Sequence, residues 1–113
     1  GAWDGLSFDE VSARDPKLSR EFWDQAGDIQ APEGESWNDV SRRVAAVVER
    51  LAAQHGESDI ICVAHFGVIL TQIALCHGQT IETALAQKIE PLSVTCINWS
   101  PDRADVIFAN HEP

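Results

Sequence analysis

The clearest pattern in the chain is an amphipathic helix near its middle. Ser36 and Asp39 have the spacing of a capping box, in which a hydroxyl and a carboxylate satisfy the first amides of a helix. Gly56 lies where such a helix would stop. We therefore predict a helix that begins after Ser36 and ends near His55. Its apolar residues recur at steps of three and four positions and so share one face: Trp37, Val40, Val44, Val47, Val48 and Leu51.

Two shorter helices are predicted before it. The segment Ser7–Glu10 is another capping box and predicts a helix that ends at about Arg14. Asp15 then has the place of a helix cap, and Pro16 suits the first helical position because its fixed φ is already helical. This second helix should end at Gly27, where an acidic loop containing proline and glycine begins.

The segment from Asp59 to Thr71 combines three patterns. Residues 59–64 are apolar at nearly every position, which is typical of a parallel strand covered on both faces. His65 follows, and then an apolar run with helical spacing that should end at Gly78. Ligands collect beyond the carboxyl ends of such strands, and a helix start offers free amides to an anion such as phosphate. His65 is therefore a candidate site residue.

The remaining elements leave the chain short of strands. Thr80 can cap a helix that continues to about Gln87. Segments Ser93–Trp99 and Ala104–Asn110 have the composition of strands, joined by a tight turn that contains proline. The predicted order is three helices, a strand, two helices and two strands, which is an α/β chain with few strands for its helices. We expect that strands are missing or are supplied by another chain.

Composition narrows the class of protein. The 113 residues suffice for one domain with a modest core. The net charge of −10 argues against a nucleic-acid or anionic membrane surface, because both need clustered Lys and Arg. No segment is apolar over the length of a membrane span. The cysteines form no CxxC pair and lie in apolar segments, which predicts buried free thiols in a cytoplasmic protein: Cys62, Cys76 and Cys96.

Four stretches carry motifs in a distinctive order and cover nearly the whole chain. They are Gly1–Val11, Pro32–Ser36 with Asp39 and Arg43, Ile61–Ile69, and Leu92–Thr95 with Val106–Asn110. Together they resemble the carboxyl-terminal half of the histidine phosphatase superfamily, the phosphoglycerate-mutase-like fold. They are similar to its Gly-x-Trp-Glu-Gly segment, its Pro-x-Gly-Glu-Ser loop with the helix after it, its strand that ends in a His-Gly motif, and its two closing strands.

The resemblance implies a partial three-layer α/β/α phosphoglycerate-mutase-like fold that lacks the amino-terminal strands. It implies that residues 1–113 are the carboxyl-terminal part of a single histidine phosphatase domain, as a fragment or as one chain of a longer or cleaved protein. The family's Arg-His-Gly nucleophile motif comes earlier in the family's sequence, and no histidine precedes His55 here. The family's acidic proton donor would fall just before Gly1.

The implied reaction is a two-step phosphoryl transfer through phosphohistidine, without a metal or cofactor. A nucleophilic histidine attacks a phosphate monoester, a carboxylic acid protonates the leaving alcohol, and water then releases the phosphate. His65 matches the family's second histidine, which holds phosphoryl oxygens. The backbone amide of Phe66 matches a phosphate-contacting position. A phenylalanine replaces the family's usual small residue there, and it would narrow the pocket, favour apolar substrates or pack on the next helix.

Other interpretations fit the same residues. His65 alone would also suit a structural, hydrogen-bonded histidine, and His55 and His77 suit helix ends, where histidine complements the dipole. No two histidines have metal-ligand spacing, so we predict no zinc site. Whether the protein is an enzyme depends on the amino-terminal half: it would be a phosphatase whose present part is inactive alone, a mutase, or a non-catalytic binding domain. The expected partners are a small phosphorylated substrate and either the missing half or a second copy.

Overall fold

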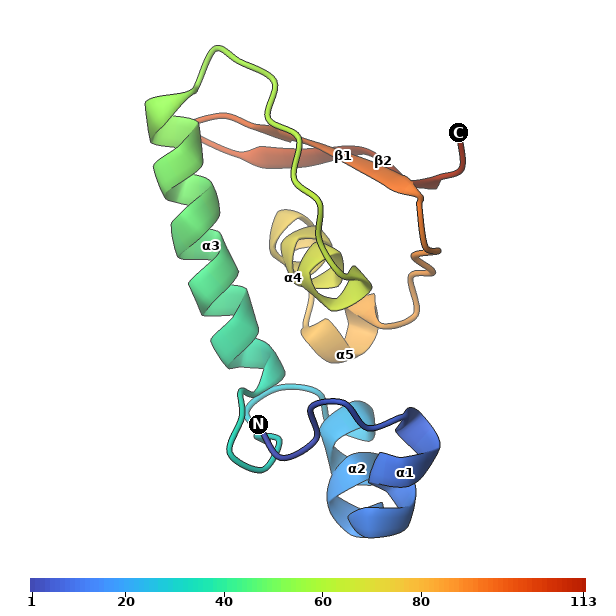
Figure 1. Cartoon of the computed structure of the whole chain (residues 1–113). Coiled ribbons are helices and arrows are strands. Elements are labelled where there is room, and N and C mark those ends of the chain that lie inside the picture. Colours follow the sequence, from blue (N-terminus) through green and yellow to red (C-terminus); the bar gives the residue numbers. More distant parts are fainter.

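The computed structural model describes all 113 residues and contains five helices and one two-stranded sheet (Figure 1). Helices α1 and α2 pair at one end of the molecule, and the long helix α3 leads away from them. Helix α4 packs against α3, α5 and strand β2. No helix combines the length and the apolar character needed to cross a membrane. The elements are α1 (Phe8–Arg14), α2 (Pro16–Asp24), α3 (Trp37–Gln54), α4 (Phe66–His77), α5 (Ile81–Ala84), β1 (Val94–Trp99) and β2 (Ala104–His111).

Both predicted capping boxes are confirmed. The Ser7 hydroxyl accepts a hydrogen bond from the Glu10 amide at the start of α1, and the Glu10 carboxylate accepts one from the Ser7 amide. Ser36 and Asp39 repeat this exchange at the start of α3. Gly78 ends α4 with φ of 62°, a left-handed conformation that glycine adopts at little cost. Local sequence signals therefore fix where three of the helices begin or end, by polar caps at α1 and α3 and by a glycine at α4.

Some predicted helix boundaries are wrong. Asp15 does not cap α2 with its side chain, because its carboxylate accepts the indole N–H of Trp3 at 2.8 Å. Helix α2 ends at Asp24 rather than at Gly27. Helix α5 is a single turn that ends at Ala84 rather than near Gln87, because the bonds that follow it span three residues and tighten the chain into turns.

The predicted hairpin of β1 and β2 is confirmed. The strands pair antiparallel, with irregular register on both sides of Cys96. Their connection is closed by the Ser100 amide, which donates to the Arg103 carbonyl at 2.8 Å. These are the only two strands that form a sheet, so the α/β character of the chain rests on one hairpin and the helices beside it.

The predicted strand at residues 59–64 is unpaired. None of these residues makes a backbone hydrogen bond, and the segment runs as an open connection from α3 to α4 (Figure 1). Ile61 is 92% exposed and Val63 is 100% exposed. Cys62 is exposed as well, so the prediction that it is a buried thiol is wrong, and Cys76 and Cys96 are half-buried. Apolar character alone did not bury this segment, because no neighbouring strand lies beside it.

The buried core is correspondingly small. Only 12 of 113 residues are buried. The accessible surface is 7822 Å², whereas a compact protein of this mass exposes about 6,100 Å². The radius of gyration is 15.1 Å, against about 13 Å for a compact chain of this length. The core joins the turn after α2 to α3, α4 and α5 through Ala26, Trp37, Ala74, Ile81 and Ala84. Phe22 and Trp23 of α2, and Leu85 after α5, pack against it.

The cap of α3 predicts a specific pH dependence of stability. Hydrogen bonds from the Ser36 amide, the Gln30 side chain and the Ser36 hydroxyl lower the pKa of Asp39 from 3.8 to about 2. A carboxyl whose pKa is lower in the folded state stabilises the fold above its unfolded pKa and loses this effect as the pH falls through the folded value. Asp39→Asn should therefore reduce the free energy of unfolding at neutral pH, by an amount that shrinks between about pH 4 and pH 2.

Urea denaturation of wild type and variant across this pH range measures the difference. Asp102→Asn is the matched control, because Asp102 is exposed and makes no hydrogen bond or ion pair. It should change stability little at any pH. An Asp39→Asn difference that stays constant from pH 7 to pH 2 would contradict the role of the charged cap.

Candidate functional site

The start of α4 offers two free backbone donors. His65 is the N-cap residue, with extended backbone (φ −78°, ψ 157°) and no capping bond from its side chain. The amides of Val68 and Ile69 donate to the His65 carbonyl at 3.0 and 3.3 Å. The amides of Phe66 and Gly67 have no acceptor in the chain. Free amides at the positive end of a helix suit an anion.

Both sequence-predicted site residues lie at this helix start. The imidazole of His65 is exposed and makes no hydrogen bond or ion pair, so the interpretation as a structural histidine finds no partner within the chain. Phe66 is 47% exposed, so about half of its surface is open to solvent beside His65. His65 and the amides of Phe66 and Gly67 are therefore adjacent, available donors on one wall of a potential site.

Three of the motif stretches are linked by direct contacts. The Ala2 amide donates to the Pro32 carbonyl at 2.8 Å, which holds the first stretch against the Pro32–Ser36 loop. The loop leads through the Ser36 cap into Trp37, the first residue of α3. The ring of Trp37 lies against Gly67, the second residue of α4. The fold thus connects the beginning of the chain to the wall that carries His65.

This wall has no positively charged side chain bound to it. None of the ion pairs in the chain involves a residue between 59 and 69. Arg43, which follows the Pro32–Ser36 loop, pairs with Glu35 at 3.0 Å. Arg42 pairs with Asp39 at 2.6 Å. A dianionic phosphoryl group held here would therefore lack the arginine contacts that favour it most.

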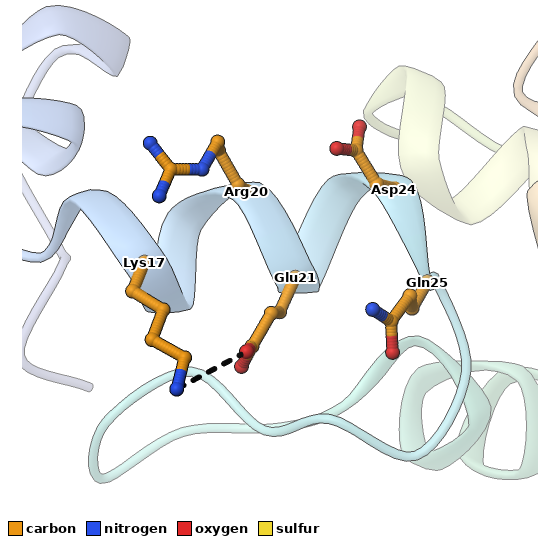
Figure 2. Close-up of a pocket in the computed structure, with 5 residues that line it drawn as sticks. All are labelled: Lys17, Arg20, Glu21, Asp24 and Gln25. Carbon is orange, nitrogen blue, oxygen red and sulfur yellow. Dashed lines mark ion pairs between the residues drawn. The ribbon is translucent and has the colours of Figure 1, made fainter.

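A hollow elsewhere on the surface does not belong to this site. It lies along α2 and is lined by charged and amide side chains, two of which, Lys17 and Glu21, form an ion pair at 3.9 Å (Figure 2). None of the motif residues lines it. It is an open, solvated helix face without an apolar lining, and its residues have no arrangement that performs chemistry. No three His, Cys, Asp or Glu side chains in the chain come together as a metal site would require.

Sequence reasoning missed Gly67 and Trp37. The available signal was a glycine in the first turn of a predicted helix, where it costs stability and so indicates a close approach of another group. Trp37 was predicted to share the apolar face of its helix, and it is buried, at 7% exposure. That it packs against the wall of the site depends on how α3 crosses α4, which no local pattern encodes.

Comparison with known proteins agrees with this architecture. Residues 1–112 match the family model described as the histidine phosphatase superfamily (branch 1). The chain is 36% identical over 96 residues to the uncharacterized protein Mb2253c of Mycobacterium bovis and to the bifunctional protein Rv2228c of Mycobacterium tuberculosis. Its structure is similar to Bacillus stearothermophilus YhfR, with a TM-score of 0.87 and 25% identity.

The similarity covers most of this chain but only part of each relative. The match spans 83% of this chain and 26% of each mycobacterial protein. The structural match spans 100% of this chain and 56% of YhfR. The family match extends over nearly all residues described above, including the α4 start with His65. The chain belongs to the histidine phosphatase superfamily.

Proposed function

We propose that this chain is one wall of the phosphoryl-transfer site of a phosphatase that hydrolyses a small phosphate monoester through a phosphohistidine. The observation that carries the proposal is the free imidazole of His65 beside the unpaired amides of Phe66 and Gly67, in a chain of this family. The mycobacterial relative named a bifunctional protein matches this chain over 26% of its length, which agrees with such a domain being part of a larger protein.

This side of the site acts by stabilising the negative charge on the phosphoryl oxygens. The amides of Phe66 and Gly67 donate to phosphoryl oxygens, and the dipole of α4, a helix of 12 residues, favours the same negative charge. His65 donates a further hydrogen bond to a phosphoryl oxygen as charge shifts during transfer. Because these donors are already oriented, they stabilise the charge of the transition state without having to reorganise, and this lowers the barrier to the reaction.

The bond-making groups come from outside residues 1–113. A nucleophilic histidine nitrogen attacks phosphorus, the bond from phosphorus to the alcohol oxygen breaks, and a carboxylic acid gives that oxygen a proton. Water then attacks phosphohistidine, the phosphorus–nitrogen bond breaks, and orthophosphate leaves. Because this chain has a net charge of −10 and its arginines near the motif loop are paired, the 113 residues alone should not hydrolyse phosphate esters.

The partner that completes the site is a further strand-bearing segment of the same domain. Residues 59–64 have unpaired backbone groups and exposed apolar side chains, and β1 pairs only with β2. The surface exceeds that of a compact protein by about 1,700 Å², which is about twice the roughly 800 Å² that one partner buries in a standard interface. A basic segment that supplies arginines would also complement the acidity of this chain.

The role of His65 is tested in the full-length gene product. His65→Ala should lower kcat/KM for p-nitrophenyl phosphate by about 100- to 1,000-fold, the cost of removing one oriented donor to transition-state charge. His55→Ala is the control, because His55 caps the far end of α3 and should leave activity unchanged. A colorimetric assay of p-nitrophenol and of free phosphate measures both variants.

The same assay separates the rival functions. An active protein that His65→Ala leaves unchanged would remove His65 from the mechanism. Transfer of the phosphoryl group between positions on a phosphoglycerate, with little free phosphate, would favour a mutase. A wild-type protein without phosphatase or mutase activity would favour a non-catalytic binding domain.

The proposal that a further segment of the domain covers residues 59–64 is tested by introducing a charge at position 63. Val63 is 100% exposed in this chain. In the 113-residue chain, Val63→Asp should change the free energy of unfolding by less than about 0.5 kcal/mol, as surface substitutions do. In the full-length gene product it should cost about 3 kcal/mol or more, because the carboxylate would be buried without a partner.

Ala53→Asp, on the exposed surface of α3, is the matched control and should cost little in both proteins. Chemical denaturation measures the free energy of unfolding of both variants in both proteins. An equally small effect of Val63→Asp in both proteins would contradict the covering of this segment. Sedimentation of the 113-residue chain as a dimer, with Val63→Asp abolishing it, would favour a second copy as the partner.

A further inference from the structure

The first turn of α4 rests directly on an aromatic ring. A methyl group at Gly67 would come within 3.2 and 3.3 Å of Cζ3 and Cη2, the outer edge of the Trp37 indole. Such distances are shorter than ordinary carbon contacts of about 3.5–4.0 Å. Gly67 has no positive φ that would require glycine, so the residue is explained by this close approach. The helix start can lie this deep only because Gly67 has no side chain.

The ring itself is held from its other sides. Phe22 and Trp23 place their ring centroids 5.8 and 5.6 Å from that of Trp37. Ala26, Ala74 and other core residues complete the surroundings, and Trp37 is 7% exposed. Its indole N–H has no acceptor in the chain, so packing alone fixes the ring. A larger side chain at position 67 would therefore displace the start of α4 rather than the ring.

We infer that Trp37 is a positioning residue that sets the depth and direction of the free amides of Phe66 and Gly67, and with them His65. The inference rests on the proposed phosphoryl-transfer function. It gives the Ser36–Asp39 cap a role beyond starting α3, because the cap fixes the residue that carries the ring. A chain of contacts thus runs from the capped loop through Trp37 and Gly67 to the donors of the site.

Two substitutions at this contact should compensate each other. Gly67→Ala adds a methyl group that moves the α4 start by a few tenths of an ångström. Trp37→Phe removes the outer edge of the indole, which faces Gly67, and keeps an aromatic ring in the core. In the double variant the added methyl group occupies the space that the smaller ring leaves. The donors should then return close to their original positions.

The test uses these three variants of the full-length gene product. Gly67→Ala should lower kcat/KM for p-nitrophenyl phosphate by about tenfold, since a misplacement of 1 Å can cost about a hundredfold. The inhibition constant of orthophosphate should rise in parallel. The double variant should recover most of both losses. Gly27→Ala is the control, because a methyl group there meets its nearest atom at an ordinary 3.6 Å.

The outcomes are distinct. Activity lost in Gly67→Ala and regained in the double variant supports a positioning role, because a merely structural contact would shift the denaturation midpoint and leave kcat/KM of the folded protein unchanged. Wild-type activity that Gly67→Ala does not alter, or losses that add in the double variant, would overturn the inference while the proposed function stands. A wild-type protein without phosphoryl-transfer activity would overturn both.

Discussion

The unsatisfied backbone of residues 59–64 is the constraint on which the rest of this structure depends. Each buried amide or carbonyl without a partner costs about 1–3 kcal/mol, so a segment with no neighbouring strand has to stay in contact with water. Its apolar side chains stay exposed with it, and the core is limited to the contacts among the helices. His65 directly follows this segment, so a strand that paired with the segment, as we propose, would also fix the approach to His65.

The other side of His65 is already well determined. Helix α4 is held by α3, α5 and β2, and its buried central turn includes Leu70, Ile73 and Ala74. Its first turn rests on Trp37, which the Ser36 cap places at the start of α3. The chain therefore combines two features. The start of α4 is fixed and its amides can bind phosphate, whereas the backbone of residues 59–64, which leads to it, is unpaired. This combination is what the proposed function requires of a chain that forms one side of a phosphoryl-transfer site.

Sequence reasoning succeeded where the determining interactions are local. Capping boxes span four residues, and the hairpin is closed across a short turn, so Ser7, Ser36 and the Ser100–Arg103 turn are visible in the sequence. The start of α4 directly after His65 was visible for a similar reason, because an apolar run, a histidine and a helix pattern follow one another directly. The site role of His65 stays a prediction. The family resemblance added a predicted phosphate contact of the Phe66 amide, which no local pattern contains.

It failed where distant segments decide the outcome. An apolar run becomes a buried strand only if neighbours pair with it, which is why residues 59–64 and Cys62 are exposed. Asp15 bonds to Trp3 rather than to its own helix, because the two segments fold back on each other. The contact between Trp37 and Gly67 depends on how α3 crosses α4. These are consequences of tertiary packing, and periodicity carries no information about them.

The proposed function requires that this chain holds a phosphoryl group whose covalent attachment point lies outside it. Brief incubation of the full-length gene product with a phosphate monoester, rapid quenching at alkaline pH and mass spectrometry of its peptides locates that attachment point. We predict a phosphohistidine on a residue outside positions 1–113, with His65 unmodified. Phosphorylation of His65 itself, or turnover without any phosphohistidine, would contradict the proposed role of this chain.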